Sequence, residues 1–516
     1  MIYPIGIQTF EKIVKDGFVY VDKTDLIYSL VTQGQIYFLS RPRRFGKSLL
    51  LSTLRAYFEG KKELFAGLKI DALEHDWHVH RVFHFDFNGV DFTMPGALHL
   101  KIEGYLYDWE EEFGISSGVD TNLGSRFNRI LQAAAEQTGR GAVVLVDEYD
   151  KPLLDVLEKD PELLEQNREI LKAFYSVFKL ADASLRFVFL TGVTKFSQVS
   201  VFSGFNQPKD ISMFDKYEAL CGITEEELHT QFAEPIREMA ASEGCTEEEM
   251  RQRLKRHYDG YHFSKEMTDI YNPFSVLNAF FSKEFGNYWF QTGTPTFLVE
   301  LLKESDYDLR LLMDGIETAA SAFTEYRADR KNPIPLIYQS GYLTIKEYDR
   351  EFGLYRLGFP NDEVRYGFLN FLVPFYTAIT DEERSFYVGK FVQELRSGDV
   401  DAFMRRFEAF FADFPYELND RTERHYQVVI YLIFKLMGQF CDAKVRGAKG
   451  RADAVVKTKD YIYVFEFKLD GSVKDALRQI DEKGYLLPYE ADGRELVKIG
   501  VSFSKEDRNL GCWEIV

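Results

Sequence analysis

The stretch Ile36–Leu50, IYFLSRPRRFGKSLL, decides the expected fold of this chain of 516 residues. Four apolar residues, Ile36–Leu39, predict a buried strand, and a short basic loop then leads to Gly46-Lys47-Ser48 at the start of a helix. A strand, a loop and a helix in that order can form a phosphate-binding loop, because backbone N–H groups and the helix N-terminus face an anion. Lys47 is expected to reach the β- and γ-phosphates of a nucleotide, and the Ser48 hydroxyl to hold Mg²⁺.

The loop departs from the general phosphate-binding pattern at one position. That pattern has a glycine five residues before Gly46, where this chain has Arg41. The match therefore favours nucleotide binding more strongly than it favours hydrolysis. The expected nucleotide contacts are Arg44, Phe45, Gly46, Lys47 and Ser48.

Two short amphipathic helices are expected within residues 7–35, around the sequence YVDKT, Tyr20–Thr24. Asp22 or Thr24 is expected to cap the second helix, Asp25–Val31. A capped helix that packs on the core explains this segment, and a border of the adenine pocket is the alternative.

The sequence GAVVLVDEYDK, Gly141–Lys151, predicts a second part of the same site. Val143–Val146 is expected to form a buried parallel strand that ends at Asp147 and Glu148. Ligands of open α/β sheets bind beyond the carboxyl ends of the strands, so both acids are expected to face Lys47. Asp147 is assigned to Mg²⁺ through water, and Glu148 to the orientation and deprotonation of the attacking water. A strand end that caps the next helix is the alternative.

A third apolar strand is expected at Leu185–Thr194, and its end is rich in hydroxyl groups. Thr191 or Thr194 is a candidate for sensing the γ-phosphate, with Lys195 nearby, and a polar strand end is the alternative. Strands alternating with helices predict a P-loop α/β domain, a parallel sheet with flanking helices, over residues 1–215.

Residues 216–375 are expected to form a mainly helical region with a β-hairpin. The acidic triplets Glu225–Glu227 and Glu247–Glu249 are interpreted as solvated helix starts, where the helix dipole favours negative charge. Tyr342–Tyr348 and Leu354–Pro360 predict the hairpin. Helices followed by a hairpin resemble a winged helix, which often binds DNA, but the acidic surroundings favour an intramolecular lid.

Residues 376–516 are expected to form a second α/β domain. An apolar helix, three strands in an antiparallel meander, a capped helix and a last strand are predicted in that order. Their expected ranges are Arg424–Met437, then Asp442–Arg446, Arg451–Lys457 and Tyr461–Leu469, then Val473–Tyr485, then Val497–Phe503.

Asp453, Glu466 and Lys468 are the candidate catalytic residues of this domain. Glu466 and Lys468 are two residues apart in one strand and therefore project from one face. Two carboxylates on adjacent strands are expected to bind Mg²⁺, while the ammonium positions water or stabilises developing negative charge. Gln479 on the next helix is expected to join them. The alternative is a structural Glu466–Lys468 ion pair with Asp453 as its neighbour.

Two further sets of side chains are weaker metal candidates. Glu423 can add a carboxylate, but Asp420-x-x-Glu423 also reads as a capping box. His78, His80 and His84 lie close together, but strand alternation alone produces that spacing.

Composition limits the possible classes of protein. The net charge of -19 argues against a broadly cationic nucleic-acid-binding surface, although a local basic groove remains compatible with it. No secretory signal is evident, and the longest apolar run, Val428–Phe434, is too short to span a membrane. The 4 cysteines form no CxxC pair. A reduced cytoplasmic location is the expectation.

Taken together, the motifs resemble one bacterial family, the AAA-ATPase-like proteins fused to a C-terminal PD-(D/E)XK nuclease-superfamily domain. The resemblance covers nearly the whole chain. It is carried by YVDKT, RPRRFGKS, VVLVDEYDKP and TGVTKFS, by YDGYHF, YNPFS and LGFPNDEVR in the middle, and by GRADAVV, VFEFKLDG and ALRQIDEKGY at the end.

The family's loop also lacks the first glycine. By resemblance, Lys47 and Ser48 bind nucleotide and Mg²⁺, and Asp147 and Glu148 serve hydrolysis. The nuclease residues implied by the resemblance are Asp453, Glu466, Lys468 and Gln479, in a restriction-endonuclease-like fold.

The leading hypothesis is an enzyme in which ATP binding, with hydrolysis, controls a Mg²⁺-dependent nuclease domain. Its expected partners are ATP and nucleic acid, DNA in preference to RNA, with no membrane and no particular oligomeric state implied. The rival hypothesis is a nucleotide-switched module that binds nucleic acid or protein through a nuclease-like domain without cleavage. A protein-remodelling ATPase has no pore-loop signal in its favour.

Overall fold

The computed structural model describes residues 1–116, 120–157, 159–196, 208–292, 298, 302, 309–324, 332–376, 381–412, 423–445, 452–468, 471–504 and 509–516. The chain divides into two compact units. Unit 1 is Met1–Tyr307 with Gly315–Val364, and unit 2 is Asp308–Asp314 with Arg365–Val516. The P-loop segment and the helical middle region thus share unit 1. The three predicted domains, with boundaries at 215 and 375, stay a prediction.

Unit 1 is built on a five-stranded sheet in the order β2-β3-β4-β1-β5. All neighbouring strands are parallel, which confirms the predicted parallel sheet. All residues of β3 are buried, as expected for a strand covered on both faces. The strands are β1 Ile36–Ser40, β2 Val82–Asp86, β3 Ala142–Asp147, β4 Leu185–Gly192 and β5 Lys209–Asp210.

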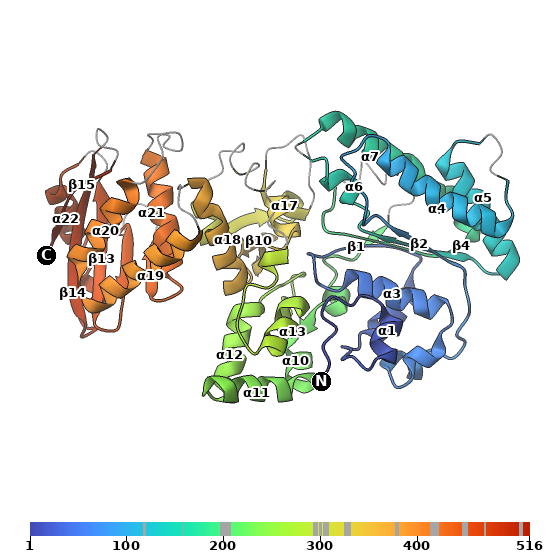
Figure 1. Cartoon of the computed structure of the whole chain (residues 1–516), viewed down its shortest axis with the longest axis horizontal. Helices are drawn as coiled ribbons and strands as arrows, with labels where there is room; N and C mark the ends of the chain where they lie inside the picture. Colours follow the sequence, from blue (N-terminus) through green and yellow to red (C-terminus); the bar gives the residue numbers. More distant parts are fainter. Residues whose placement is uncertain are drawn as a thin grey trace. The chain divides into compact units, whose positions relative to one another are not determined.

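Helices cover both faces of this sheet. Helices α1 and α3 lie on one face, and α4, α5 and α7 lie on the other (Figure 1). The bounds are α1 Phe10–Lys15, α2 Thr24–Gln33, α3 Lys47–Phe58, α4 Ala97–Phe113, α5 Leu123–Thr138, α6 Lys151–Leu154, α7 Pro161–Tyr175 and α8 Val177–Leu180.

The start of α2 differs in detail from its prediction. The residue at the N-cap position is Lys23, whose side chain makes no capping bond. Asp22 instead accepts hydrogen bonds from the N–H and the hydroxyl of Thr24, at 2.9 and 2.6 Å. Asp22 therefore does stabilise the first turn of α2, but it lies one residue before the N-cap position.

The middle region of unit 1 is mainly helical, as predicted. Both acidic triplets begin helices, with capping boxes formed by Thr224 and Glu227 and by Thr246 and Glu249. Glu227 differs from the predicted solvated role, because it forms an ion pair of 2.5 Å with the largely buried Lys23. The elements are β6 Ile223–Thr224, α10 Glu225–Gln231, α11 Ala233–Glu243, α12 Glu247–Tyr258, β7 Ile270–Tyr271 and α13 Pro273–Ser282.

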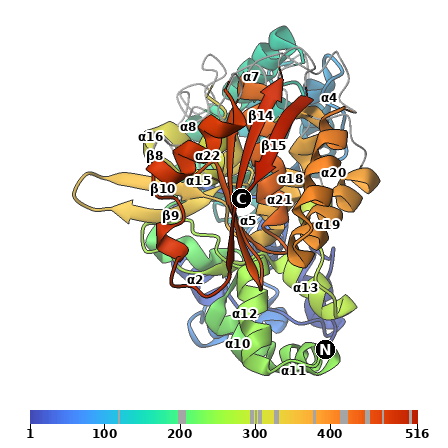
Figure 2. The ribbon, with the colours of Figure 1, turned by 90° about the vertical axis from the view of Figure 1, so that its left-hand side faces the viewer.

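The predicted hairpin is present and extends as an arm (Figure 2). Its strands are β9 Thr344–Asp349 and β10 Leu354–Gly358, preceded by α16 Ser321–Thr324 and α17 Ile334–Gln339. The sequence did not predict β8 Ile316–Ala319, which pairs with β10 in the order β8-β10-β9. A short helix followed by a hairpin matches the expected order of a winged-helix-like element.

Unit 2 contains a five-stranded mixed sheet in the order β11-β12-β13-β14-β15. Strands β11–β13 form the predicted antiparallel meander, and α22 connects β13 to the parallel strand β14. The strand predicted at 497–503 is present as β14, but the prediction that it is the last strand was wrong, because β15 follows and pairs antiparallel with it. The strands are β11 Asp442–Val445, β12 Ala454–Lys457, β13 Tyr461–Lys468, β14 Glu495–Ser504 and β15 Asn509–Ile515.

Aromatic side chains form much of the core of unit 2. Phe465 in β13 packs against Phe403 and Phe434, with ring centroids 5.6 and 5.1 Å apart. This contact joins the sheet to the helices through the face of β13 that carries Phe465. The helices are α15 Leu309–Asp314, α18 Asp362–Tyr376, which enters unit 2 at Arg365, α19 Asp381–Ser397, α20 Val400–Ala412, α21 Glu423–Met437 and α22 Val473–Glu482.

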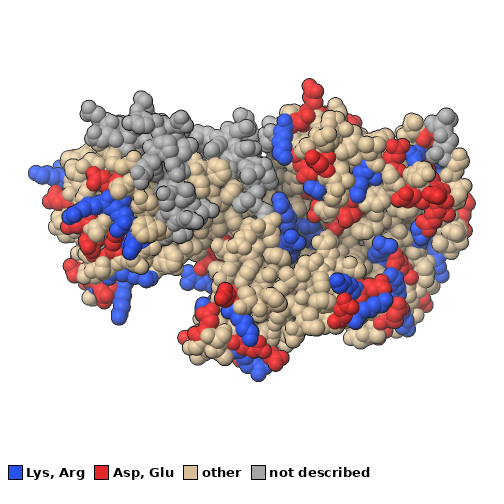
Figure 3. Space-filling view, viewed as in Figure 1, with Lys and Arg blue, Asp and Glu red and all other residues tan. Residues whose placement is uncertain are grey.

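Two surface properties bear on the possible partners. On the face seen in Figure 3, Lys and Arg side chains are interspersed with Asp and Glu, and no extended basic area covers the described residues there. Within the described part of the chain, no helix has the length and apolar character that crossing a membrane requires.

Candidate nucleotide and nuclease sites

The predicted nucleotide residues come together at one edge of the unit 1 sheet. Strand β4 lies between β1 and β3, with Leu39 opposite Thr191 and Val146 opposite Leu190. The loop that follows β1 and the acids that end β3 therefore flank the end of β4. This register brings Lys47, Asp147 and Thr191 to the carboxyl edge, where open α/β sheets bind ligands.

The loop before α3 has the backbone conformation of an anion site. Gly46 has a φ of +94° and stands at the N-cap position of α3, where no side chain caps the first turn. Arg44 also has a positive φ, 66°, which is unusual for a residue with a side chain. The N–H groups at the start of α3 are therefore available to an anion, and Ser48 lies in this first turn.

Lys47 is held inside the loop. Its side chain is largely buried, and its Nζ donates to the carbonyls of Arg41 and Pro42 at 2.8 and 3.0 Å. Burial lowers the pKa of Lys47, and the negative charges of Asp147, Glu148 and Asp150 oppose that shift. The Lys47 ammonium is suited to bind phosphate, and the carboxylates that it faces are suited to bind the cation that accompanies the phosphate.

Arg41, which replaces the usual glycine, is a structural anchor. The side chain is only 1% exposed, and its guanidinium lies 4.1 Å from the ring centroid of Phe263. It donates four hydrogen bonds to backbone carbonyls, those of Ser40, Ser212, Tyr217 and Glu218. The loop is thus held by contacts to residues far away in the sequence, where a glycine would supply only conformational freedom.

Phe45 and Arg44 contact the middle region of unit 1. The buried Phe45 ring packs edge-on against Tyr261 and Phe263, at 4.8 and 5.4 Å between centroids. The Arg44 guanidinium lies 5.1 Å from the ring centroid of Phe274 in α13. Both side chains therefore connect the loop to the region that was predicted to act as a lid.

Asp147 and Glu148 occupy different environments. Asp147 is buried and accepts hydrogen bonds from the Thr191 hydroxyl at 2.7 Å and from the Glu148 N–H at 3.1 Å. Glu148 has a φ of 51°, a strained conformation of the kind that clusters at functional sites. Burial raises the pKa of Glu148, although Lys47 opposes the shift. Glu148 is therefore suited to accept a proton. Asp147, in contrast, is held in place by the Thr191 hydroxyl.

Asp150 completes the site and was not singled out from the sequence. It is 1% exposed and accepts hydrogen bonds from the N–H groups of Val193 and Thr194 and from the Thr194 hydroxyl, the last at 2.7 Å. A Cβ on Gly192 would lie 2.7 Å from Asp150 Oδ1, so only glycine permits this approach. The second aspartate of DEYD and the hydroxyl-rich TGVT were the available signals.

Thr194 and Lys195 are each engaged by an aspartate. The Thr194 hydroxyl is bonded to Asp150, and Lys195 Nζ forms an ion pair of 2.6 Å with Asp210. Of the two predicted sensor threonines, Thr191 is the one that contacts the acidic strand end.

An apolar cavity of about 110 Å³ lies beside Gly46. Its lining includes Tyr20 and Lys23 from YVDKT, together with Leu49 and Leu277. A mostly apolar pocket next to a phosphate loop suits a nucleobase. The position of YVDKT at this cavity favours the alternative in which the segment borders the adenine pocket.

The four predicted nuclease residues converge in unit 2. Lys468 Nζ donates to Glu466 Oε1 at 3.0 Å and to Gln479 Oε1 at 2.5 Å. Asp453 Oδ2 accepts the N–H of Phe467 at 2.9 Å, which places it beside β13. Asp453 directly precedes β12 and is not within it as predicted, because β12 begins at Ala454.

The electrostatics of this cluster fit a cation. Glu466 is 2% exposed, and its Oε2 has no hydrogen-bond partner among the described residues. Burial raises the pKa of Glu466, and Asp453 raises it further, while Lys468 opposes both. Burial also raises the pKa of Asp453. The buried Glu466 carboxylate, with one oxygen that lacks a partner, and the half-buried Asp453 carboxylate beside it match the oxygen ligands that Mg²⁺ prefers.

The weaker metal prediction at Glu423 is not tested. The side chain of Glu423, Asp420 and Arg451, the first residue of a predicted strand, lie outside the part of the chain that the structure describes. Within that part, no group of three or more His, Cys, Asp or Glu side chains is arranged to hold a metal. His80 Nδ1 lies 2.8 Å from the Gly141 carbonyl, which gives this histidine a structural role.

Comparison with known proteins finds matches to both ends of the chain. A family model described as a predicted AAA-ATPase of the AAA-ATPase-like type matches residues 4–202. A model described as the PD-(D/E)XK nuclease superfamily matches residues 421–513. An "uncharacterized protein in vnfD 5′ region" of Azotobacter chroococcum mcd 1 is 38% identical over 520 residues, which cover 98% of this chain and 97% of that protein.

Among solved structures, the Aeropyrum pernix Orc1 protein in complex with DNA aligns with 67% of this chain and 92% of that chain, at 12% identity. The TM-score is 0.25, and a likeness this weak carries no argument about fold or about DNA.

Proposed function

Because the chain belongs to the bacterial family of AAA-ATPase-like proteins with a C-terminal PD-(D/E)XK nuclease-superfamily domain, we propose that it is an ATP-controlled, Mg²⁺-dependent nuclease directed at DNA. The observation that carries this proposal is the convergence of Asp453, Glu466, Lys468 and Gln479. ATP binding and hydrolysis are assigned to unit 1, and phosphodiester cleavage is assigned to unit 2.

In unit 1, the chain's own residues divide the work of ATP hydrolysis. Lys47 and the N–H groups at the start of α3 bind the phosphates, and Ser48 and Asp147 supply oxygens for Mg²⁺. Bound Mg²⁺ neutralises phosphate charge. Thr191 holds the Asp147 carboxylate by its hydrogen bond, and Glu148, whose pKa burial raises, takes the proton of the attacking water.

In unit 2, Asp453 and Glu466 would hold Mg²⁺, which supplies Lewis-acid chemistry to the phosphodiester. Lys468 places an ammonium where negative charge develops during cleavage. Gln479 accepts a hydrogen bond from Lys468 and so orients its Nζ, and the Tyr485 hydroxyl lies 3.3 Å from Gln479 Nε2. The contacts among Tyr485, Gln479 and Lys468 fix the position of the lysine side chain, and the neutral Gln479 leaves the ammonium charged.

Cleavage is tested by incubating the full chain with DNA and RNA substrates, with and without ATP and Mg²⁺. We expect Mg²⁺-dependent cleavage that Glu466→Gln abolishes, a loss of at least 100-fold for an essential group. The matched control is Glu482→Gln, an exposed glutamate at the end of α22. Retained cleavage in a folded Glu466→Gln protein would rule out this site.

Hydrolysis of ATP is tested separately. Glu148→Gln should keep nucleotide binding and lose phosphate release, because the amide cannot accept the proton of the attacking water. Glu162→Gln, an exposed glutamate in the first turn of α7, is the control. Full phosphate release by Glu148→Gln would show that another group is the base.

A nucleotide-switched binding module is the second candidate, and one contact favours it. Lys468 already bridges Glu466 and Gln479, as it would in a domain that holds its partner without cleavage. A crystal soaked with Mn²⁺ separates the two functions. An ion bound by Asp453 and Glu466 supports the nuclease, and a site still bridged by Lys468 without an ion supports the binding module.

A further inference from the structure

Three consecutive carbonyls of the phosphate loop are each held by a donor. Those of Arg41 and Pro42 accept the Lys47 ammonium at 2.8 and 3.0 Å, and that of Arg43 accepts the indole N–H of Trp289 at 3.0 Å. Trp289 lies 246 residues further along the chain than Arg43, in the middle region of unit 1. The middle region therefore holds one of the three carbonyls that fix the shape of the loop.

The Arg43 carbonyl determines the direction of the next N–H group. No peptide bond among the described residues is cis, so the Arg44 N–H points opposite to the Arg43 C=O. The Arg44 N–H has no hydrogen-bond partner within the described part of the chain. Free N–H groups bind an anion, whereas a carbonyl oxygen turned into the loop repels it. The bond from Trp289 therefore keeps this peptide unit in an orientation that suits phosphate.

The backbone of the same tryptophan is held by α18. The Trp289 N–H donates to Glu363 Oε1 at 2.7 Å, and both residues are buried. Glu363 lies in the first turn of α18, and this helix continues into unit 2 at Arg365. One residue thus contacts the phosphate loop through its side chain and, through its backbone, the helix that leads out of unit 1.

Close packing supports the contact between Trp289 and the loop. Gly341, which precedes β9, has a φ of +92°, and a Cβ at this position would lie 2.7 Å from Pro42 Cβ and 3.3 Å from Trp289 Cζ2. The Trp289 ring also packs against Tyr342, with 5.2 Å between the ring centroids. Only glycine permits this approach. Because such packed groups leave little free space, a displacement of the loop also displaces Trp289.

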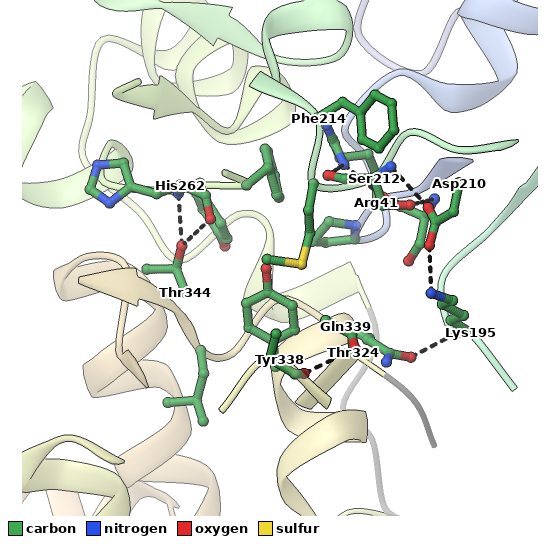
Figure 4. A pocket seen from close by; sticks show the side chains of 17 residues that line it. Arg41, Lys195, Asp210, Ser212, Phe214, His262, Thr324, Tyr338, Gln339 and Thr344 are labelled. Carbon is green, nitrogen blue, oxygen red and sulfur yellow. Dashed lines mark hydrogen bonds and ion pairs between the residues drawn. The ribbon is translucent and has the colours of Figure 1, made fainter. Parts of the chain in front are cut away.

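A second contact between the sheet edge and the middle region leads to a different helix. The Lys195 N–H donates to Gln339 Oε1 at 2.7 Å, and Lys195 Nζ pairs with Asp210 at 2.6 Å, beside a cavity of about 270 Å³ (Figure 4). Gln339 belongs to α17, which lies wholly within unit 1. Of these two contacts, the one through Trp289 is the one that reaches the helix entering unit 2.

We propose that Trp289 is a positioning residue that couples the phosphate loop to α18, with its indole N–H on Arg43 and its backbone N–H on Glu363. This inference rests on the proposed ATP site and deepens it, because it names the residues through which bound nucleotide acts on the rest of the chain. Coupling of this kind is reciprocal. Loss of the Glu363 contact therefore also weakens nucleotide binding, although Glu363 lies outside the loop.

Hydrogen exchange of the full chain, followed by mass spectrometry, tests the coupling without any need for cleavage. A saturating non-hydrolysable ATP analogue with Mg²⁺ should slow exchange at residues 364–370 of α18 by about 5-fold or more in the wild type, as expected for coupled sites. The physical reason is that an occupied loop holds Trp289, and Trp289 holds the first turn of the helix. Titration with a fluorescent ATP analogue measures nucleotide binding in parallel.

Two variants break the coupling at its two ends. Trp289→Phe keeps an aromatic ring and removes the indole N–H, and Glu363→Ala removes the acceptor of the backbone N–H while Asn361 still caps α18. Both should lose the exchange response at saturating nucleotide, and Trp289→Phe should raise the nucleotide Kd by about 3- to 10-fold. Glu363→Gln keeps an acceptor oxygen and should retain the response. Trp513→Phe, the same substitution in β15, is the control.

The outcomes separate this inference from the function on which it rests. A full exchange response at α18 in Trp289→Phe and Glu363→Ala, with folding verified by circular dichroism, overturns the inference. Nucleotide binding by the wild type without a response at α18 also overturns it, and both results leave the ATP site in place. Absence of nucleotide binding by the wild type overturns the proposed ATP site and this inference together.

Discussion

At the scale of single residues, Glu466 makes a prediction that can be measured without activity. Burial and the neighbouring Asp453 raise its pKa, so the folded state holds the proton more tightly than the unfolded chain does. The stability that this group contributes is complete below its unfolded-state pKa and is lost as the pH rises through the folded-state pKa. Glu466→Gln stays neutral, so without metal its Tm should exceed that of the wild type increasingly above about pH 4.3.

Metal should reverse this difference. Mg²⁺ bound only to the folded wild type adds stability by mass action, whereas the amide of Glu466→Gln weakens that site. Thermal unfolding with and without Mg²⁺, with Glu482→Gln as the control, measures both effects. A difference in Tm that is constant with pH would contradict the raised pKa.

A second residue, Asp259 in YDGYHF, makes a pH prediction in unit 1. It is 1% exposed, and neither carboxylate oxygen is hydrogen-bonded to a described side chain. Burial raises the pKa of Asp259 to about 7, with Asp269 adding to the shift and Lys255 opposing it. Its contribution to stability is complete below its unfolded-state pKa and is lost as the pH rises through about 7.

The free energy of unfolding of Asp259→Asn should therefore rise relative to that of the wild type by about 1–3 kcal/mol as the pH is raised through neutrality. This is the usual cost of a buried polar group without a partner. Chemical denaturation at a series of pH values measures the change. The exposed Asp16→Asn variant should show no such trend, and the absence of a trend in Asp259→Asn would contradict a neutral buried carboxyl.

At the scale of elements, α22 connects local sequence to the nuclease site. Ser472 and Asp475 form a capping box at the start of this helix, which was predicted to be capped, and Gln479 on the same helix holds Lys468. Ser472→Ala should lower stability by about 1 kcal/mol, as loss of an N-cap does. We expect Mg²⁺ affinity, measured by calorimetry, to change little, because Gln479 is also held by its contact with Tyr485.

Ser504→Ala provides a comparison at the end of β14, where no helix cap is removed. A loss of Mg²⁺ affinity in Ser472→Ala that exceeds its loss of stability would show that the first turn of α22 itself orders the metal site.

At the scale of the whole molecule, the proposal requires that nucleotide at unit 1 alters cleavage at unit 2. ATP should change the cleavage rate of the wild type by about 5- to 150-fold, the usual range of allosteric coupling. Lys47→Met should lose this response because the ammonium that binds the phosphates is gone, but it should keep basal Mg²⁺-dependent cleavage. Glu466→Gln should show the opposite pattern, with ATP binding intact and cleavage lost.

Single-turnover cleavage and fluorescent-nucleotide binding measure these two functions in the same variants. Lys62→Met, an exposed lysine, is the control for Lys47→Met. A cleavage rate in Lys47→Met that still follows ATP would contradict control through this loop.

The sequence by itself determined the features that depend on neighbouring residues. The apolar sequence Tyr461–Phe465 predicted β13, the capped start predicted α22, and the order of strand, glycine and lysine predicted the loop around Lys47. Family resemblance then covered both ends of the chain. These features could be read because each one is stabilised within a few residues of where it is encoded.

Only the tertiary structure decided the features that join distant segments. Arg41 departs from the glycine of the general phosphate-binding pattern, and the reason is tertiary: the carbonyls of Ser212, Tyr217 and Glu218 surround its guanidinium. Asp150 acquired a role through Val193 and Thr194, and β15 through its pairing with β14. The physical reason is that burial and hydrogen-bond satisfaction belong to the packed molecule, and no local pattern specifies which distant group will be the partner.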